Sequence, residues 1–131
     1  MSSDTRAVDL TSPRHIGVVV KDRDKTMEFL HSNWGIGPWY PADVSTDKEQ
    51  MIVGEPFRLK VAHAKLLGSL LLELIQPEGT SLWSEFLETH GEGLHHIAYN
   101  VSNWHEMVRI RSTRRQDDSG CCRLGEALLL S

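Results

Sequence analysis

The chain has 131 residues, of which 40% are hydrophobic and 24% are charged. This length suits one globular domain, and the apolar content is sufficient for one core, so the composition excludes two separate domains and wholesale disorder. The formal net charge of −4 argues against generic nucleic-acid binding, which depends on clustered basic side chains. No apolar stretch is long enough to span a membrane and residues 1–12 are polar, so we expect a cytoplasmic protein with no membrane partner.

The cysteines and the charge are unevenly distributed. The only two cysteines, Cys121 and Cys122, are adjacent, so they cannot close a long loop, which excludes a secreted disulfide scaffold and favours a reducing compartment. Residues 109–131 carry five basic and three acidic side chains, a net +2, which leaves −6 for the first 108 residues. The C-terminal segment therefore differs in character from the rest of the chain.

Apolar periodicity predicts alternating strands and helices. Apolar or β-branched runs predict the strands, and apolar residues three and four apart predict the helices. Asp22 or Asp24 can cap the first helix, whose buried face is marked by Met27, Leu30 and Trp34. The expected order is strand 14–21, helix 22–34, strand 39–44, loop 45–56, strand 57–61, strand 69–75, helix 81–90, strand 94–101 and a helix from 103.

Two of these segments resemble each other. Residues 15–22, His-Ile-Gly-Val-Val-Val-Lys-Asp, align with residues 96–103, His-Ile-Ala-Tyr-Asn-Val-Ser-Asn. Each has His-Ile and a small residue, then a valine five residues after the histidine, then a side chain able to cap a helix. A strand and helix that recur at an offset of 81 indicate an internal duplication.

Two histidines and one glutamate stand out in the predicted strands. Strand alternation puts His15 on one face with Gly17 and Val19, opposite an apolar face that we expect to pack on helices. His96 takes the corresponding place in the repeated strand. Glu73 lies within a leucine-rich strand, where a carboxylate is costly unless a cation or hydrogen-bond donors accompany it. These side chains, on three strands, are suitable ligands for a divalent transition metal.

Structural interpretations of the same residues remain open. A single strand histidine is more often a hydrogen-bonded structural residue than a ligand, and Glu73 can pair with Lys60 or Lys65 across the hairpin. His95 is expected to point away from His96, and His63 either lines a pocket or faces water. The tryptophans at helical spacings are expected in the core: Trp34, Trp83 and Trp104.

Three motifs together resemble the vicinal oxygen chelate superfamily, which includes glyoxalase, bleomycin resistance proteins and dioxygenases. They are residues 15–22, Leu-Glu-Leu-Ile-Gln-Pro at 72–77 and Gly-Glu-Gly-Leu-His-His-Ile-Ala-Tyr at 91–99, and they are most similar to those of methylmalonyl-CoA epimerases. The resemblance implies an α+β fold in which paired βαβββ modules form a cupped mixed sheet. It matches His15, Glu73 and His96 to ligands of one divalent metal ion (Co, Zn, Ni, Mn or Fe).

The resemblance also implies a layout and an activity. The layout is a single domain over 1–131: a flexible lead-in (1–13), a first module (14–79), a linking helix (80–93), the start of a second module (94–110) and an atypical tail (111–131). The implied enzyme is a metal-dependent epimerase, isomerase or lyase of the glyoxalase type. It would abstract a proton next to a carbonyl of a small-molecule carbonyl or acyl-thioester substrate, stabilise the resulting enolate and form a homodimer or higher homo-oligomer.

Further site residues are less closely tied to the motifs. Candidate catalytic residues are Glu55 and His63, and candidates for the substrate pocket are Trp39, Tyr40 and Asn100. The alternatives in function are a metal-free sequestering protein on the same scaffold, which binds a small molecule, and an inactive truncated form.

The second module is expected to be incomplete. The offset of 81 would put a counterpart of Glu73 near position 154, beyond residue 131. We interpret the tail from 111 as an altered reading frame, an alternative splice or a truncated gene model. Residues 125–130 are either a substitute strand that brings Glu126 to the metal or an accidental resemblance to one.

Overall fold

The computed structural model describes residues 8–49, 51–53, 55–101, 121–122 and 127–130. Its elements are β1 (Val8–Val19), α1 (Arg23–Trp34), β2 (Tyr40–Ser45), β3 (Met51–Val53), β4 (Arg58–Leu67), β5 (Leu70–Glu78), α2 (Leu82–His90), β6 (Gly93–Val101), β7 (Cys121–Cys122) and β8 (Ala127–Leu130). The helix expected from residue 103, with Trp104, and the proposed role of Glu126 lie outside the described residues.

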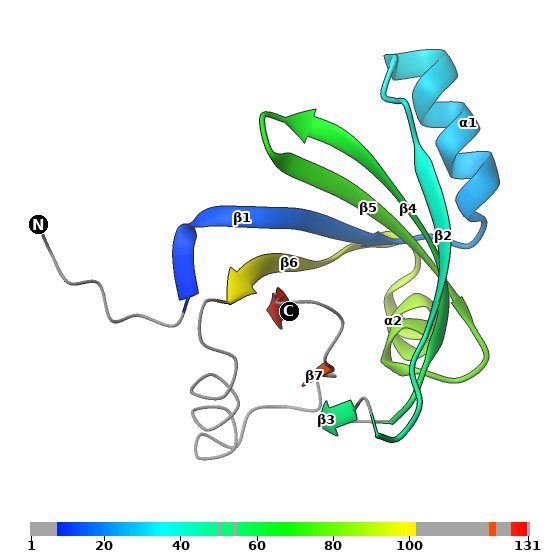
Figure 1. Ribbon diagram of the computed structural model, residues 1–131. Helices are drawn as coiled ribbons and strands as arrows, with labels where there is room; N and C mark the ends of the chain where they lie inside the picture. Colours follow the sequence, from blue (N-terminus) through cyan, green and yellow to red (C-terminus); the bar gives the residue numbers. More distant parts are fainter. Residues whose placement is uncertain (1–7, 50, 54, 102–120, 123–126, 131) are drawn as a thin grey trace, which may run out of the picture.

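Six strands form one mixed sheet in the order β2-β4-β5-β1-β6-β8. β1 and β5 are parallel, and the other neighbouring pairs are antiparallel. Figure 1 shows this sheet curving from β2 round to β6, with α1 on its outer side. The elements β1, α1, β2, β4 and β5 make a βαβββ module, and β6 follows α2 as a second copy of β1. The predicted α+β class with a cupped mixed sheet is confirmed.

Local sequence explains where the helices begin and end. The Asp22 carboxylate accepts a hydrogen bond from the backbone N–H of Lys25 at 3.1 Å, so Asp22, not Asp24, caps α1. Gly35 ends this helix in the left-handed region at φ 68°. At the start of α2, the side chains of Ser81 and Ser84 each accept from the other's backbone N–H, a reciprocal capping box.

The hydrophobic core lies on the same face of the sheet as the two histidines. Its strand residues share a face with His15 and Glu73 by alternation, and α2 covers them with Trp83, which is 2% exposed. The opposite face, which the sequence predicts to pack on helices, also carries buried residues such as Ala62 and Leu74, and α1 packs against β4 and β5 there. The core comprises Val19, Phe57, Leu59, Val61, Ile75 and Trp83. One face of the sheet thus holds the apolar core at one end and the histidines at the other.

Helix α1 packs against β4 and β5 without burying any residue fully. Met27 and Leu30 are half-buried, as the spacing predicts, but Phe29 is 57% exposed and Trp34 is 72% exposed. Trp34 is therefore not a core residue. It is the last residue of α1 and precedes the C-cap Gly35.

Three boundaries differ from the expected ones. β1 begins at Val8, which pairs with Val101, so part of the expected flexible lead-in belongs to a strand. β3 lies inside the expected loop 45–56 and pairs with β7 in a separate two-stranded sheet. β5 continues through Pro77 to Glu78. No helix within the described ranges is long and apolar enough to cross a membrane.

The two tryptophans provide a test of the core. Trp83→Ala should lower the free energy of unfolding by about 3–5 kcal/mol, because it removes a buried aromatic side chain and leaves a cavity. Trp34→Ala should change it by no more than about 0.5 kcal/mol, because that side chain is already solvated. Urea denaturation of both variants measures the difference, and equal losses would contradict the described packing.

Candidate metal centre

One row of residues crosses the sheet at the position of Glu73. Tyr40 on β2 pairs with His63 on β4, and His63 pairs with Glu73 on β5. Glu73 pairs with Gly17 on β1, and Gly17 pairs with His96 on β6. Partners in such a row project from the same face of the sheet. The fold therefore aligns residues of five strands, from position 17 to position 96, in one row.

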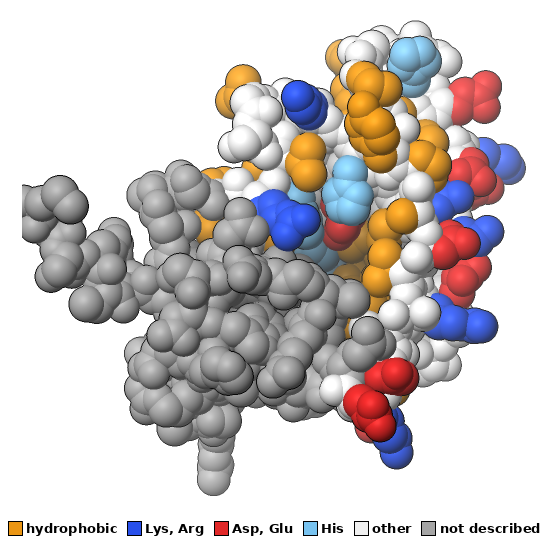
Figure 2. Space-filling view, in the orientation of Figure 1, with side chains coloured by type: hydrophobic (Ala, Val, Ile, Leu, Met, Phe, Trp, Pro, Cys, Tyr) orange, Lys and Arg blue, Asp and Glu red, His pale blue; other side chains and the backbone are white. Residues whose placement is uncertain are grey.

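His15, Glu73 and His96 converge on one point. The Nε2 atoms of the two histidines lie 3.2 Å apart, and Oε1 of Glu73 lies 3.2 Å from Nε2 of His15 and 3.6 Å from Nε2 of His96. All three side chains are largely shielded from solvent, and the Glu73 side chain is 13% exposed. Figure 2 shows histidine side chains gathered round an acidic side chain in a hollow of this face.

The donor set fits a divalent transition metal. Bonds of about 2.0–2.2 Å to nitrogen and oxygen put neighbouring ligands of a tetrahedral or octahedral ion about 3.0–3.5 Å apart. The separations among the two Nε2 atoms and Oε1 agree with that spacing to about 0.1 Å. Among the described residues, the ion pairs of Glu73 are with histidines, and Lys60 pairs with Glu78 at 3.9 Å. The group could therefore hold a metal ion, and the pairing of Glu73 with Lys60 is not found.

His63 is a fourth member of the cluster. Its Nε2 lies 2.6 Å from Oε2 of Glu73, and its ring centroid lies 5.8 Å from that of His15. Burial by itself raises the pKa of Glu73, but hydrogen bonds from His15 and His63 outweigh the burial and hold this pKa well below its ordinary value. Glu73 is therefore a carboxylate that offers Oε1 to His15 and Oε2 to His63.

Gly17 leaves the space that the His96 ring occupies. A Cβ atom built at Gly17 would overlap the imidazole of His96, including a contact of 2.8 Å with Nδ1. Ala98, the small residue of the repeated motif, lies opposite His15 and is completely buried. The small residue after each His-Ile pair therefore faces the histidine of the other strand.

His95 does not point away from His96 as alternation predicts. Gly17 pairs with His96 but Val18 pairs with Leu94, so His95 is the extra residue of a β-bulge. Nδ1 of His95 lies 2.9 Å from Nδ1 of His96. Burial, with a smaller effect of the His96 charge, lowers the pKa of His95 from 6.5 to about 4, so His95 is neutral at pH 7.

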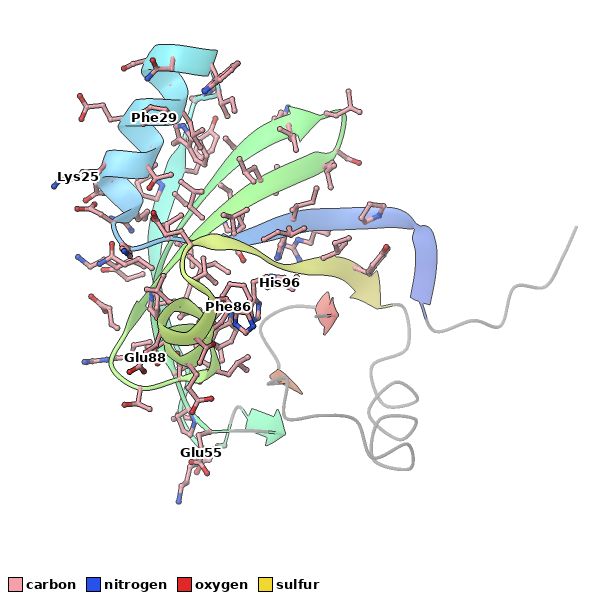
Figure 3. All side chains as sticks on the ribbon, turned by 180° about the vertical axis from the view of Figure 1, so that it is seen from behind. Lys25, Phe29, Glu55, Phe86, Glu88 and His96 are labelled. Atoms are coloured by element: carbon pink, nitrogen blue, oxygen red, sulfur yellow. The ribbon has the colours of Figure 1, made fainter. Side chains whose placement is uncertain are left out.

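The remaining residues that the sequence predicts for a pocket or for catalysis make no described contact with the cluster. Glu55 is exposed between β3 and β4, and Figure 3 shows it at the lower edge of the molecule, below α2 and away from His96. Tyr40 is 65% exposed on the row of Glu73, and Nε1 of Trp39 is buried without a hydrogen-bond partner among the described residues. Asn100 lies in β6, but its side chain is not described. These roles in a pocket or in catalysis stay predictions.

Sequence reasoning missed the roles of Gly17 and His95 at this centre. The small residue that follows His-Ile in both motifs was a signal for Gly17. Its steric role, however, follows only from the register between β1 and β6. The bulge at His95 leaves no signal in the sequence, because alternation alone sends neighbouring side chains to opposite faces.

Comparison with known families and structures agrees with this geometry. The Glyoxalase/Bleomycin resistance protein/Dioxygenase superfamily matches residues 14–113, so the chain belongs to that superfamily. Its fold is similar to that of a methylmalonyl-CoA epimerase from Mycobacterium tuberculosis, with a TM-score of 0.62 and 23% identity over 87% of this chain and 69% of that one. No curated protein gives a significant match.

Two further solved structures are somewhat more similar in sequence. A variant of the Streptomyces coelicolor methylmalonyl-CoA epimerase in complex with 2-nitronate-propionyl-CoA has a TM-score of 0.60 and 28% identity, over 80% of this chain and 73% of that one. A methylmalonyl-CoA epimerase in complex with methylmalonyl-CoA and NH4+ has a TM-score of 0.58 and 27% identity, over 77% and 68%.

The space at Gly17 can be tested without any metal. Gly17→Ala should lower the free energy of unfolding by about 1–3 kcal/mol, because the new methyl group overlaps the His96 ring. Gly93→Ala is the matched control, since its Cα has open space around it and is not in the left-handed region.

A double-variant cycle separates this overlap from any general effect of alanine. In a His96→Ala background, adding Gly17→Ala should have almost no cost, because the ring that it would strike is gone. Denaturation of the four chains measures the coupling. An undiminished cost in the His96→Ala background would show that another contact restricts position 17.

Proposed function

We propose that this protein is a metal-dependent isomerase or epimerase of the glyoxalase type, which removes a proton next to a carbonyl group. The observation that carries the proposal is the convergence of two histidine nitrogens and a carboxylate oxygen at the spacing of metal ligands. Three protein ligands are typical of catalytic metal sites, where the remaining positions receive water or substrate. The fold and the superfamily membership support the same activity.

His15, Glu73 and His96 would hold the metal through Nε2, Oε1 and Nε2. When bound there, a divalent ion supplies Lewis acidity, which polarises a substrate carbonyl and makes the neighbouring C–H more acidic. The three side chains lie in a part of the sheet that is largely shielded from solvent. Charge interactions are stronger in such a place than in water.

His63 is the residue best suited to take the proton. A carboxylate only accepts hydrogen bonds, so the 2.6 Å contact makes Nε2 of His63 the donor to Oε2 of Glu73. With Nε2 engaged as this donor, Nδ1 is the nitrogen of the ring that can accept a proton. The His63 side chain is 30% exposed, more than the other members of the cluster, so it can meet a substrate. Glu55 has no comparable contact with the centre.

An acyl thioester is the substrate class that the relatives favour. Two methylmalonyl-CoA epimerases that are 27–28% identical to this chain were solved with methylmalonyl-CoA or 2-nitronate-propionyl-CoA. In an acyl thioester with a second carbonyl group, the proton between the two carbonyls is acidic, and neighbouring oxygens can bind one metal ion. We propose this class for the present chain. Lyase activity, a cytoplasmic location and a homodimer stay predictions.

Metal binding is the first test. The purified protein, stripped with chelator and titrated with Co²⁺ or Zn²⁺ by calorimetry, should bind about one ion per chain. His15→Ala and His96→Ala should each lower the affinity by at least about 100-fold, because each removes a ligand. Exposed His31→Ala is the control. Failure of the unaltered chain to bind either ion would overturn the metal-dependent activity, and small-molecule binding that persists in chelator would favour a sequestering protein.

Proton abstraction is the second test. The metal-loaded protein in D₂O should introduce deuterium at C2 of methylmalonyl-CoA, as mass spectrometry measures. His63→Ala should bind metal normally but exchange about 10²–10⁴-fold more slowly, the usual effect of losing a general base. The exchange rate of Glu55→Gln decides whether Glu55 or His63 is the base. A large loss in Glu55→Gln, with normal exchange in His63→Ala, would reverse the assignment.

A further inference from the structure

The β-bulge between β1 and β6 puts two consecutive histidines in contact. The pairing runs from Gly17↔His96 directly to Val18↔Leu94, so His95 has no partner of its own on β1. A bulge turns the extra residue away from strict alternation and often redirects a side chain beside a functional site. Here the two imidazoles are perpendicular, at 89°, with centroids 5.1 Å apart and the Nδ1 atoms 2.9 Å apart.

Helix α2 holds the His95 ring against its neighbour. The Phe86 ring lies perpendicular to it with a centroid separation of 4.9 Å, and the buried ring of Trp83 lies 6.1 Å away. Figure 3 shows Phe86 on α2 beside the strand that carries His96. Because both aromatic residues belong to a capped helix that covers the core, the position of His95 is set by the packing of the whole domain.

We propose that His95 is a positioning residue: its Nδ1 accepts a hydrogen bond from Nδ1–H of His96, which leaves the lone pair on Nε2 of His96 facing His15 and Glu73. A 2.9 Å separation of two imidazole nitrogens requires one donor and one acceptor. Only a proton on Nδ1 of His96 leaves its Nε2 free as a ligand atom. A ligand histidine whose other nitrogen donates to a fixed acceptor is oriented and made more basic.

The two histidines of the centre are not equivalent in this respect. Nδ1 of His15 is buried without a hydrogen-bond partner among the described residues. Nε2 of His15 lies 3.2 Å from the Glu73 carboxylate, which only accepts hydrogen bonds, so this nitrogen carries a proton; it also lies 3.2 Å from Nε2 of His96. In the metal-free protein, His15 would share this donor between Glu73 and His96, and His96 would donate to His95. This chain of hydrogen bonds requires the same tautomer of His96 that metal binding requires.

The tautomer of His96 can be measured without metal, so the inference can be tested separately from the proposed metal-dependent function on which its significance rests. Long-range ¹⁵N–¹H correlation spectra of the metal-free protein should show the proton of His96 on Nδ1. It should remain there in His95→Asn, whose amide oxygen can accept near the same place. In His95→Leu, which cannot accept, His96 should shift toward the Nε2–H form.

Zinc affinity gives the second measurement. By calorimetry with Zn²⁺, His95→Leu should bind about 10–100-fold more weakly than the unaltered chain, and His95→Asn should recover most of the loss. His90→Leu is the matched control: His90 stacks on the same Phe86 at 4.8 Å but is exposed and makes no described contact with His96. Its zinc affinity should be unchanged.

The outcomes separate the two proposals. An Nε2–H tautomer in the unaltered metal-free protein, or equal zinc affinity in His95→Leu and the unaltered chain, would overturn the role of His95. If His95→Leu fails to fold, the tautomer of the unaltered protein and the affinity of His95→Asn still decide it. If no chain binds zinc but His96 has the expected tautomer, the metal-dependent function fails and the positioning of His96 by His95 stands.

Discussion

A carboxylate inside a β-sheet must be surrounded by donors or a cation, because burial otherwise favours its neutral form. Glu73 meets this requirement with histidines from the strands on both sides of it: His63 on β4, His15 on β1 and His96 on β6. Hydrogen bonds from His63 and His15 outweigh the burial and keep the carboxylate charged. Glu73 on β5 therefore links side chains from β4, β1 and β6 in one cluster.

The approach of β1 to β6 depends on the small residues of the duplicated motif. In the antiparallel register, Gly17 lies opposite His96 and Ala98 lies opposite His15, so each imidazole has space above the partner strand. A larger side chain at position 17 would overlap the ring of His96. The repeated His-Ile-small pattern thus has a steric meaning: two histidines can point toward each other across a strand pair only if each faces a small residue. The same small residues that make the two motifs alike therefore also allow the two histidines to face each other.

Sequence patterns predicted most of the elements and the three clustered residues, because alternation and capping are local, but they missed β3 and β7. Glu73 was recognisable as a charged residue in an apolar strand, and His15 and His96 as the repeated histidines. The apolar cluster on the histidines' own face was not predictable, since it depends on where α2 packs Trp83. The bulge at His95 was not predictable either, because it belongs to the pairing of two strands and not to one of them.

The strands next to β1 and β6 differ in direction and in how far their described pairing reaches toward the cluster. On the β1 side, β5 runs parallel and sets Glu73 beside Gly17, directly in the row of the centre. On the β6 side, β8 runs antiparallel, and its described pairing ends at Ile97↔Leu130, one residue short of the His96 row. Among the described residues, the ligand atoms that converge are thus three, two from the first module and one from β6. A divalent transition metal takes at least four ligands, so an ion held by these three side chains would have at least one further position to fill, and under the proposed function that position would receive substrate.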